Sequence, residues 1–263
     1  MLDDELAKEV RVPFKDTRYD RAGELFQDDQ SIQLFNLLVN SKTYENVNDT
    51  YEIIPYRQIK EWYYYREDYW ITFGFDRNHP GQSATVIDCG AYIGDSVLNI
   101  CESIPEKDIY YYALEPLNEN AEIIRSTEVF YKKCAELHVL EYGAGEKDEK
   151  LYFHLPEGGE TGGGKFTDQE EGAAGLLEIR KLDDLEIDYR GTLYIKMDIE
   201  GSELQALKGA EATIKKHRPF LAVCLYHRKN DLIEIPLYIK SLGVEYDYYL
   251  RGGYHTILWA IPK

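Results

Sequence analysis

The sequence predicts an α/β protein whose mostly parallel sheet is preceded by a helical extension. Two observations carry this prediction. From residue 84 onward, short apolar runs alternate with stretches of helical periodicity, whereas the first 80 residues lack this alternation. Several of the apolar runs are followed by acidic or glycine-containing segments. Repeated strand–helix units favour a parallel sheet that is covered by helices on both faces.

Five apolar runs are expected to form parallel strands, with amphipathic helices between them. Two further runs at the end of the chain are joined by Arg251, Gly252 and Gly253, which predicts a hairpin that adds one antiparallel strand. Ser202 and Gln205 have the spacing of a helix capping box. The expected strands cover residues 84–88, 109–114, 138–142, 192–198, 220–226, 246–250 and 256–261, and the expected helices cover 95–103, 118–131, 202–216 and 232–242.

Residues 1–80 are expected to form an N-terminal helical cap, and residues 81–263 the main domain. Residues 31–39 place apolar side chains at helical spacing, and an aromatic-rich segment follows at 51–75. The turn signal at 78–81 closes the region. Its aromatic side chains either stack on a sugar or aromatic ligand, or pack in the core or against a partner. The region is also a candidate surface for a homodimer.

Residues 143–191 interrupt the strand–helix alternation. Residues 151–155 have the composition of a strand, and residues 158–175 are rich in glycine, so we expect a mobile loop there. Residues 159–165 nearly match a phosphate-binding P-loop. However, Phe166 replaces the required Ser or Thr and no helical pattern follows. We therefore predict a flexible loop and no phosphate site.

Composition excludes several classes of partner. The formal net charge of −18 would repel nucleic acid. No apolar run approaches the roughly 20 residues that span a bilayer, and the acidic N-terminus lacks the apolar part of a secretory signal. We therefore expect a cytoplasmic protein with neither nucleic acid nor membrane as partner. The cysteines have no CxxC pair and no metal-ligand spacing, which predicts reduced thiols and no metal site: Cys89, Cys101, Cys134 and Cys224.

A glycine-containing turn follows the first predicted strand, at the end of the strand where doubly wound sheets bind ligands. It contains Asp88, Gly90, Gly94 and Ser96, with Tyr92 in place of the middle glycine of a dinucleotide fingerprint. The missing glycine argues against a pyrophosphate on this loop. S-adenosylmethionine has no phosphate, and a wider turn suits it. Asp88 would favour its ammonium and sulfonium charges. A purely structural turn is the competing interpretation.

An acid at the end of the second predicted strand strengthens the cofactor interpretation. Glu115 follows Gly94 by 21 residues, close to the spacing at which such an acid accepts the ribose hydroxyls of a nucleoside. Pro116 ends the strand and begins the loop into the next helix. The loop alone would leave NAD as an alternative cofactor, but the loop and the spaced acid together predict binding of a nucleoside cofactor.

Three carboxylates follow the strand expected at 192–198. Asp198, Glu200 and Glu203 lie within six residues, which is costly unless they are solvated or bound to cations. The preference of helix N-termini for acids explains Glu203. It does not explain Asp198, which is expected at the edge of the sheet.

These segments together resemble the FkbM family of methyltransferases. The resemblance covers about residues 84–261. It implies a class I methyltransferase (Rossmann-like) fold, S-adenosylmethionine as cofactor and, mostly, O-methylation of hydroxyls on sugars or natural products. The chain departs from the family where Arg251 is followed by Gly252 instead of His. The matching motifs are Asp88-x-Gly90-x-x-x-Gly94-x-Ser96, Glu115-Pro116-x-Asn118, Leu182-Asp183-Asp184-Leu185, Lys196-x-Asp198-x-Glu200-Gly201-x-Glu203 and Tyr226-His227-x-x-x-Asp231.

Methyl transfer to a hydroxyl depends mostly on alignment of the acceptor oxygen, and a general base assists it. His227 is the candidate base, with a surface or structural histidine as the competing interpretation. Asp198 is expected to orient the acceptor or the methionine end of the cofactor, and Glu200 to do either. No Pro-Pro pair is present, which disfavours amino-methylation of nucleic-acid bases.

The expected function is therefore S-adenosylmethionine-dependent O-methylation of a small-molecule or saccharide acceptor. The alternative is a protein that keeps the methyltransferase fold without catalysis and serves as a scaffold for a partner.

Overall fold

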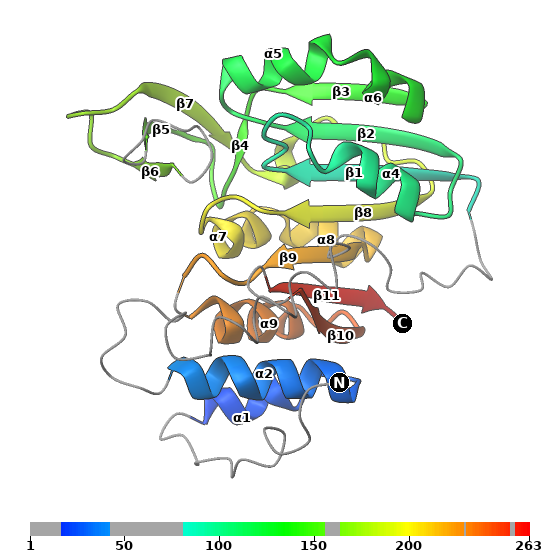
Figure 1. Ribbon diagram of the computed structural model, residues 1–263, viewed down its shortest axis with the longest axis vertical. Helices are drawn as coiled ribbons and strands as arrows, with labels where there is room; N and C mark the ends of the chain where they lie inside the picture. Colours follow the sequence, from blue (N-terminus) through cyan, green and yellow to red (C-terminus); the bar gives the residue numbers. More distant parts are fainter. Residues whose placement is uncertain (1–16, 43–80, 156–163, 229, 253–255) are drawn as a thin grey trace, which may run out of the picture.

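The computed structural model describes residues 17–42, 81–155, 164–228, 230–252 and 256–263. Seven strands form its main sheet in the order β10-β11-β9-β8-β1-β2-β3 (Figure 1). Their bounds are β1 Ser83–Cys89, β2 Asp108–Leu114, β3 Glu136–Leu140, β8 Thr192–Met197, β9 Phe220–Cys224, β10 Tyr246–Arg251 and β11 Ile257–Pro262.

The main sheet is parallel except for β11. β1 pairs in parallel with β2 and β8, β2 with β3, and β8 with β9. β11 runs antiparallel to both β9 and β10, so that β10 again points the same way as the parallel strands. Gly252, with a φ of 79°, follows β10 directly and permits the chain to reverse there. The predicted α/β sheet with one antiparallel strand from a C-terminal hairpin is confirmed.

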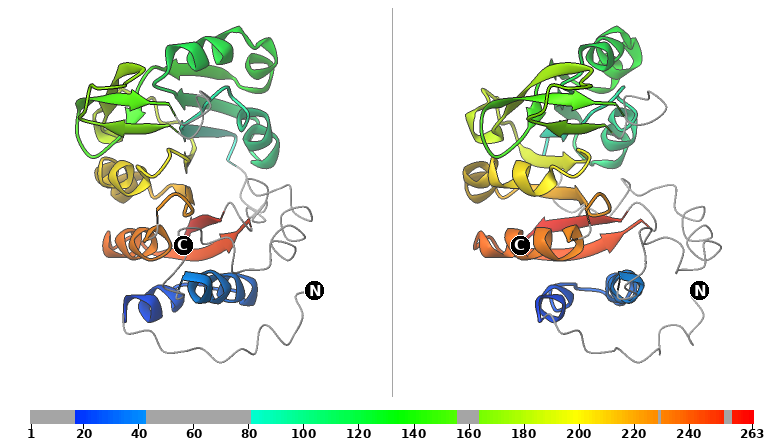
Figure 2. Two further views of the ribbon diagram at one scale, coloured as in Figure 1. Left: turned by 60° about the vertical axis from the view of Figure 1, so that its left-hand side comes forward. Right: turned by 90° about the vertical axis from the view of Figure 1, so that its left-hand side faces the viewer.

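Helices cover both faces of the sheet because successive strand residues point to opposite sides (Figure 2). In β1, Val86 packs with Val97 of α4 in one apolar cluster, whereas Ile87 belongs to the cluster that contains Ile214 of α8. Among the described residues, no helix is both long and apolar enough to cross a membrane. The helices on the two faces are α4 Val97–Ser103, α5 Asn118–Ser126, α6 Glu128–Lys133, α7 Glu203–Lys208, α8 Glu211–His217 and α9 Asp231–Ser241.

Two of the predicted helices are each divided. Thr127 adopts an extended ψ of 91° between α5 and α6. Between α7 and α8, a Cβ on Gly209 would lie 1.9 Å from the carbonyl oxygen of Gly145, so glycine allows another segment to approach closely. The predicted capping box is wrong, because Ser202 makes no side-chain cap. Asp183, in the short 3-10 helix η2 (Leu182–Asp184), accepts hydrogen bonds from two backbone amides of the first turn of α8.

The interruption at 143–191 contains a second, smaller sheet. The strand expected at 151–155 is present as β5. Of the expected mobile loop at 158–175, residues 165–167 form β6 and Gly175 begins β7, whereas residues 158–163 lie outside the described residues. The small sheet extends from the edge at which the parallel strands end (Figure 1). Its strands are β4 Gly143–Ala144, β5 Glu149–His154, β6 Lys165–Thr167 and β7 Gly175–Arg180, in the order β4-β7-β5-β6.

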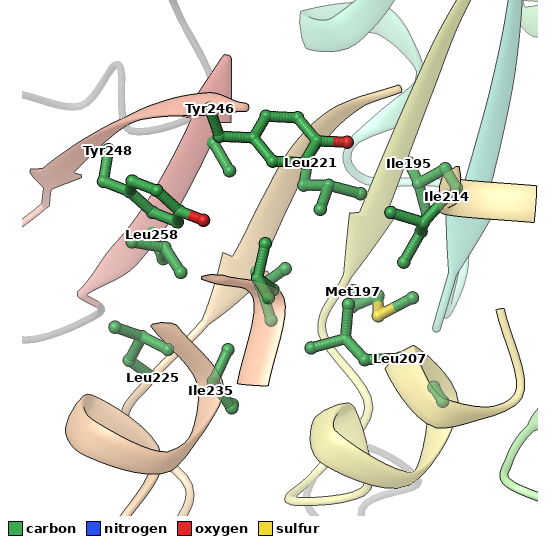
Figure 3. Packing of buried hydrophobic residues seen from close by; sticks show 14 of the residues in the cluster. Ile195, Met197, Leu207, Ile214, Leu221, Leu225, Ile235, Tyr246, Tyr248 and Leu258 are labelled. Atoms are coloured by element: carbon green, nitrogen blue, oxygen red, sulfur yellow. The ribbon is translucent and has the colours of Figure 1, made fainter. Parts of the chain in front are cut away.

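The core between the sheet and helices α7 to α9 is built mostly from aliphatic side chains, and Figure 3 shows two of its tyrosines among them. Burying one such Leu or Ile side chain stabilises the fold by about 1.5–3 kcal/mol. The cluster links the two halves of the sheet, since its members come from β1 and β2 as well as from β8, β9, β10 and β11. Those labelled in the figure are Ile195, Met197, Leu207, Ile214, Leu221, Leu225, Ile235, Tyr246, Tyr248 and Leu258.

The N-terminal helices α1 (Arg18–Gly23) and α2 (Asp29–Lys42) lie beside β10 and α9 (Figure 1). Phe26 forms a parallel bridge with Tyr248, and the amide of Leu250 donates to Oγ of Ser31 at 2.9 Å. Apolar residues of both helices belong to the same cluster as the sheet. The helix predicted from residues 31–39 is therefore present and covers the sheet edge. The aromatic-rich segment and the proposed boundary at residue 80 lie outside the described residues.

An ion pair fastens this edge. Nη2 of Arg251, at the end of β10, lies 2.6 Å from Oδ2 of Asp28, just before α2. Partial burial acts to raise the pKa of Asp28, but hydrogen bonds from Arg251 and Ser31 and the charge of Arg251 outweigh it and hold the pKa below its ordinary value. The charged form of Asp28 therefore stabilises the docked helices.

We expect Asp28→Asn to lower the free energy of unfolding by about 1 kcal/mol at pH 7, a value discounted for partial exposure. The measurement is urea unfolding at several pH values. Because the folded-state pKa is lowered, the difference from the natural protein is complete above about pH 4 and shrinks as pH falls through that pKa. Glu24→Gln, at an exposed position of the same segment, is the control. An equal loss in both variants would contradict the prediction.

Candidate active site

A buried ion pair lies where β1 and β8 end. Asp88 and Lys196 are partners in the parallel register, so their side chains project from the same face of the sheet. Nζ of Lys196 lies 2.7 Å from Oδ1 of Asp88, and the two side chains are 6% and 0% exposed. Burial disfavours the charge of Lys196, but the carboxylates of Asp88 and Asp198 outweigh it and raise the pKa of the lysine. The charged form of Lys196 is therefore favoured beside Asp88.

The surroundings of Asp88 change the role expected for it. Its Oδ2 accepts hydrogen bonds from Oγ of Ser96 at 3.0 Å and from the hydroxyl of Tyr111 at 2.7 Å. Lys196 compensates its charge and also donates to the carbonyl oxygen of Gly90 at 2.6 Å. Asp88 and Ser96 thus lie beneath the glycine turn and hold it. The expected direct attraction between Asp88 and a cofactor's positive charge is not supported, because that carboxylate is buried and already paired.

The turn itself needs left-handed backbone at three positions. Gly90 and Gly94 have φ of 79° and 85°, and Tyr92 has φ of 49°, which is uncommon for a residue with a side chain. A Cβ on Gly90 would lie 1.9 Å from the carbonyl oxygen of Asp198, and one on Gly94 would lie 2.4 Å from the ring of Phe130. The two glycines therefore allow the left-handed backbone of the turn and also the close approach of Asp198 and Phe130.

Glu115 connects the turn to the end of β2. Its Oε2 accepts from the amide of Tyr92 at 2.9 Å, and its Oε1 accepts from the amide of Leu117 and from Nδ2 of Asn120, both at 3.1 Å. Burial raises the pKa of Glu115, and these hydrogen bonds partly offset the rise. A carboxylate has about four acceptor sites, so one remains. The expectation that it takes both ribose hydroxyls would require one present donor to move. Pro116 follows and packs near Gly143 of β4.

The acidic segment after β8 lies directly against the turn. The amide of Asp198 donates to the carbonyl of Cys89 at 3.1 Å, which continues the strand pairing beyond Met197. Oδ1 of Asp198 accepts from the hydroxyl of Tyr226 at 2.8 Å. Glu200 has a left-handed φ of 56° and carries its carboxylate at the partly exposed rim. The strand end thus places acids beside Gly90.

His227 lies among these acids. Its Nε2 is 3.5 Å from Oδ1 of Asp198 and 3.5 Å from Oε2 of Glu200, and its Nδ1 is 2.8 Å from Oε1 of Glu203. Burial acts to lower the pKa of His227, but contact with Glu203 and the negative charges of all three acids outweigh it and raise the pKa. The cluster therefore favours the imidazolium over the neutral imidazole that a general base needs.

The structure brings the turn, Glu115, Asp198, Glu200 and His227 to one edge of the sheet. Sequence reasoning missed two functional contacts, those of Lys196 and Tyr226, and misjudged Glu203, which is fully buried instead of being a solvated helix-end acid. The signal for Lys196 was present, because a lysine inside an apolar parallel strand must find a buried partner. Nothing local indicated that Glu203 meets His227.

The strand order, the single antiparallel strand and the glycine turn after β1 define a class I methyltransferase fold. The model of the methyltransferase FkbM domain matches residues 88–246, more than half of the chain. The chain therefore belongs to the FkbM methyltransferase family, which confirms the resemblance of its motifs.

A solved structure with the same family name agrees with this assignment. Methyltransferase FkbM from Methylobacillus flagellatus KT is 27% identical with a TM-score of 0.66, and the alignment covers 92% of this chain but 58% of that one. This chain thus spans less than two thirds of that relative's length. An O-methyltransferase from Bacillus cereus in complex with SAH is 12% identical over 99% and 96% of the two chains, with a TM-score of 0.39. A search of curated proteins found no match.

We expect Gly90→Ala to lower the free energy of unfolding by about 2 kcal/mol or more, because a side chain is strained at this φ and would collide with the backbone of Asp198. Urea unfolding measures the loss. Gly175→Ala is the matched control, since a Cβ there meets no atom within 4 Å. Equal stability of the two variants would show that the turn is not held as tightly as described.

Proposed function

We propose that this chain transfers a methyl group from S-adenosylmethionine to a hydroxyl oxygen on a sugar or small natural product. One observation carries the proposal: residues at the end of β8 contact both the glycine turn, where the cofactor would bind, and the cluster around His227, where the acceptor would bind. Lys196 holds the glycine turn through the carbonyl of Gly90, and two residues later Asp198 opens the cluster that contains His227. A cofactor on the turn and an acceptor on the cluster would therefore be neighbours.

The residues at the turn fit S-adenosylmethionine better than a dinucleotide. Tyr92 occupies the place where a pyrophosphate needs glycine, and Glu115 retains one acceptor site for a ribose hydroxyl. Bound there, the cofactor would supply an electrophilic methyl on its sulfonium. Gly90, Tyr92 and Gly94 would contact it through their backbone, while Asp88 and Ser96 position the turn from below.

On the acceptor side, we propose that Asp198, Glu200 and His227 orient the acceptor hydroxyl, and that the carboxylates around His227 favour loss of its proton. Alignment of an oxygen with a methyl carbon supplies a large part of the rate enhancement in a displacement of this kind. The acids around His227 also set a preference. A cluster with three carboxylates repels anionic acceptors, which supports a neutral hydroxyl compound over nucleic acid.

Cofactor binding is tested first. We expect Glu115→Gln to raise the Kd for S-adenosylhomocysteine about tenfold or more, because hydrogen bonds to a charged acceptor contribute about 1.5–3 kcal/mol. Isothermal calorimetry measures the Kd, and Glu119→Gln, at an exposed position of α5, is the control. If the natural protein binds neither S-adenosylhomocysteine nor S-adenosylmethionine, the proposed function fails and the scaffold alternative gains support.

Acceptor activation is tested separately. We expect His227→Ala to bind S-adenosylhomocysteine with a Kd within about threefold of the natural protein, and to methylate about 100-fold more slowly because the acceptor hydroxyl is no longer aligned. The assay follows transfer of radiolabelled methyl to a panel of saccharides and hydroxylated natural products. His217→Ala, at the end of α8, is the control. Undiminished turnover of His227→Ala would remove His227 from the acceptor machinery.

A further inference from the structure

Three side chains behind the acceptor side of the site form a compact group of metal-ligating atoms. Asp198, Glu203 and His227 each offer one ligand atom, and these atoms all lie within 4.8 Å of one another. They come from three different elements: the end of β8, the first turn of α7 and the segment after β9. Two carboxylates and one imidazole are ligands that suit divalent ions such as Mn²⁺ and Zn²⁺.

Two buried atoms of this group have no hydrogen-bond partner. Oε1 of Glu203 accepts from the amides of Ile199 and Gly201, but its Oε2 accepts from none although the side chain is 0% exposed. Nδ1 of His227, on a side chain that is 9% exposed, lies 2.8 Å from Glu203 without the geometry of a hydrogen bond. Buried polar atoms are almost always paired, so two orphans side by side indicate a missing ligand.

The charges of the cluster point to the same ligand. Asp198, Glu203 and the neighbouring Glu200 carry three negative charges around one imidazole. Even a protonated His227 leaves the cluster with an excess of negative charge in a largely buried place, which is unfavourable without a further cation. The side chain of Asp198, which is 23% exposed, leaves a path for an ion to enter from solvent.

We propose that Asp198, Glu203 and His227 bind a divalent metal ion. This departs from the sequence analysis, which predicted no metal site. The proposal also rests on the proposed function, because the cation would hold the acceptor oxygen beside the glycine turn. A metal bound to a hydroxyl lowers its pKa, so the acceptor needs no strong base. The hydroxyl proton passes to water, the oxygen–methyl bond forms, and the methyl–sulfur bond breaks with its electron pair left on sulfur.

The direct test is metal binding by the full chain after treatment with a chelator and its removal. Titration with Mn²⁺, followed by electron paramagnetic resonance, is expected to show one tight site per chain. Asp198→Asn and His227→Ala are each expected to weaken Mn²⁺ binding tenfold or more, whereas Glu186→Gln, an exposed carboxylate elsewhere, leaves it unchanged. Asp198→Asn changes a partly exposed group, and its thermal unfolding shows whether it remains folded. Absence of a tight site, or equal binding in all variants, would overturn the proposal.

A second measurement separates this proposal from the proposed function. Calorimetry with S-adenosylhomocysteine on the metal-free protein reports on the cofactor side alone. Binding of S-adenosylhomocysteine together with methyl transfer that is lost on chelation and restored by Mn²⁺ supports both proposals. Methyl transfer that persists without metal overturns the metal site but leaves the methyltransferase function intact. Tight Mn²⁺ binding without any cofactor binding supports the metal site and overturns the function.

Discussion

The buried pair between Asp88 and Lys196 is the constraint on which the rest of the site depends. It joins the ends of the two central strands, and both partners reach further: Lys196 to the carbonyl of Gly90, Asp88 to Ser96 and Tyr111. Removing one partner of a buried ion pair typically costs about 3–5 kcal/mol, because the other charge stays buried without compensation. The pair thus couples the stability of the sheet to the shape of the glycine turn.

The end of β8 carries charges of both signs, and they lie in different surroundings. Lys196 points to the face where Asp88 lies, and the buried carboxylate of Asp88 neutralises its positive charge. Asp198, just beyond the strand, belongs to an acidic cluster with Glu203 and His227. Neutralised charge lies under the glycine turn, and excess negative charge lies beside it. This separation gives a cationic ligand a place next to the proposed cofactor site without disturbing the turn.

Much of the fold followed from local pattern. The alternation of apolar runs and helical periodicity located every strand of the main sheet, and Arg251-Gly252-Gly253 indicated the closing hairpin. The errors arose where long-range contacts override local signals. Gly209 divides a predicted helix because Gly145 packs against it, and a glycine-rich stretch contributes to the second sheet because β5 offers it backbone partners. Composition alone carries no information about such partners.

By itself, the sequence determined the order of the elements, the glycine turn and the spacing of Glu115, because these depend on residues that are near one another along the chain. Only the tertiary structure decided which charges meet. It buried Asp88 against Lys196, so that Asp88 is not available to pair with a ligand. It also placed Glu203 of α7 beside His227, which follows β9. Glu203 and His227 are 24 residues apart, and Asp88 and Lys196 are 108 residues apart. Strand order and register make each pair neighbours, and no local sequence pattern encodes strand order or register.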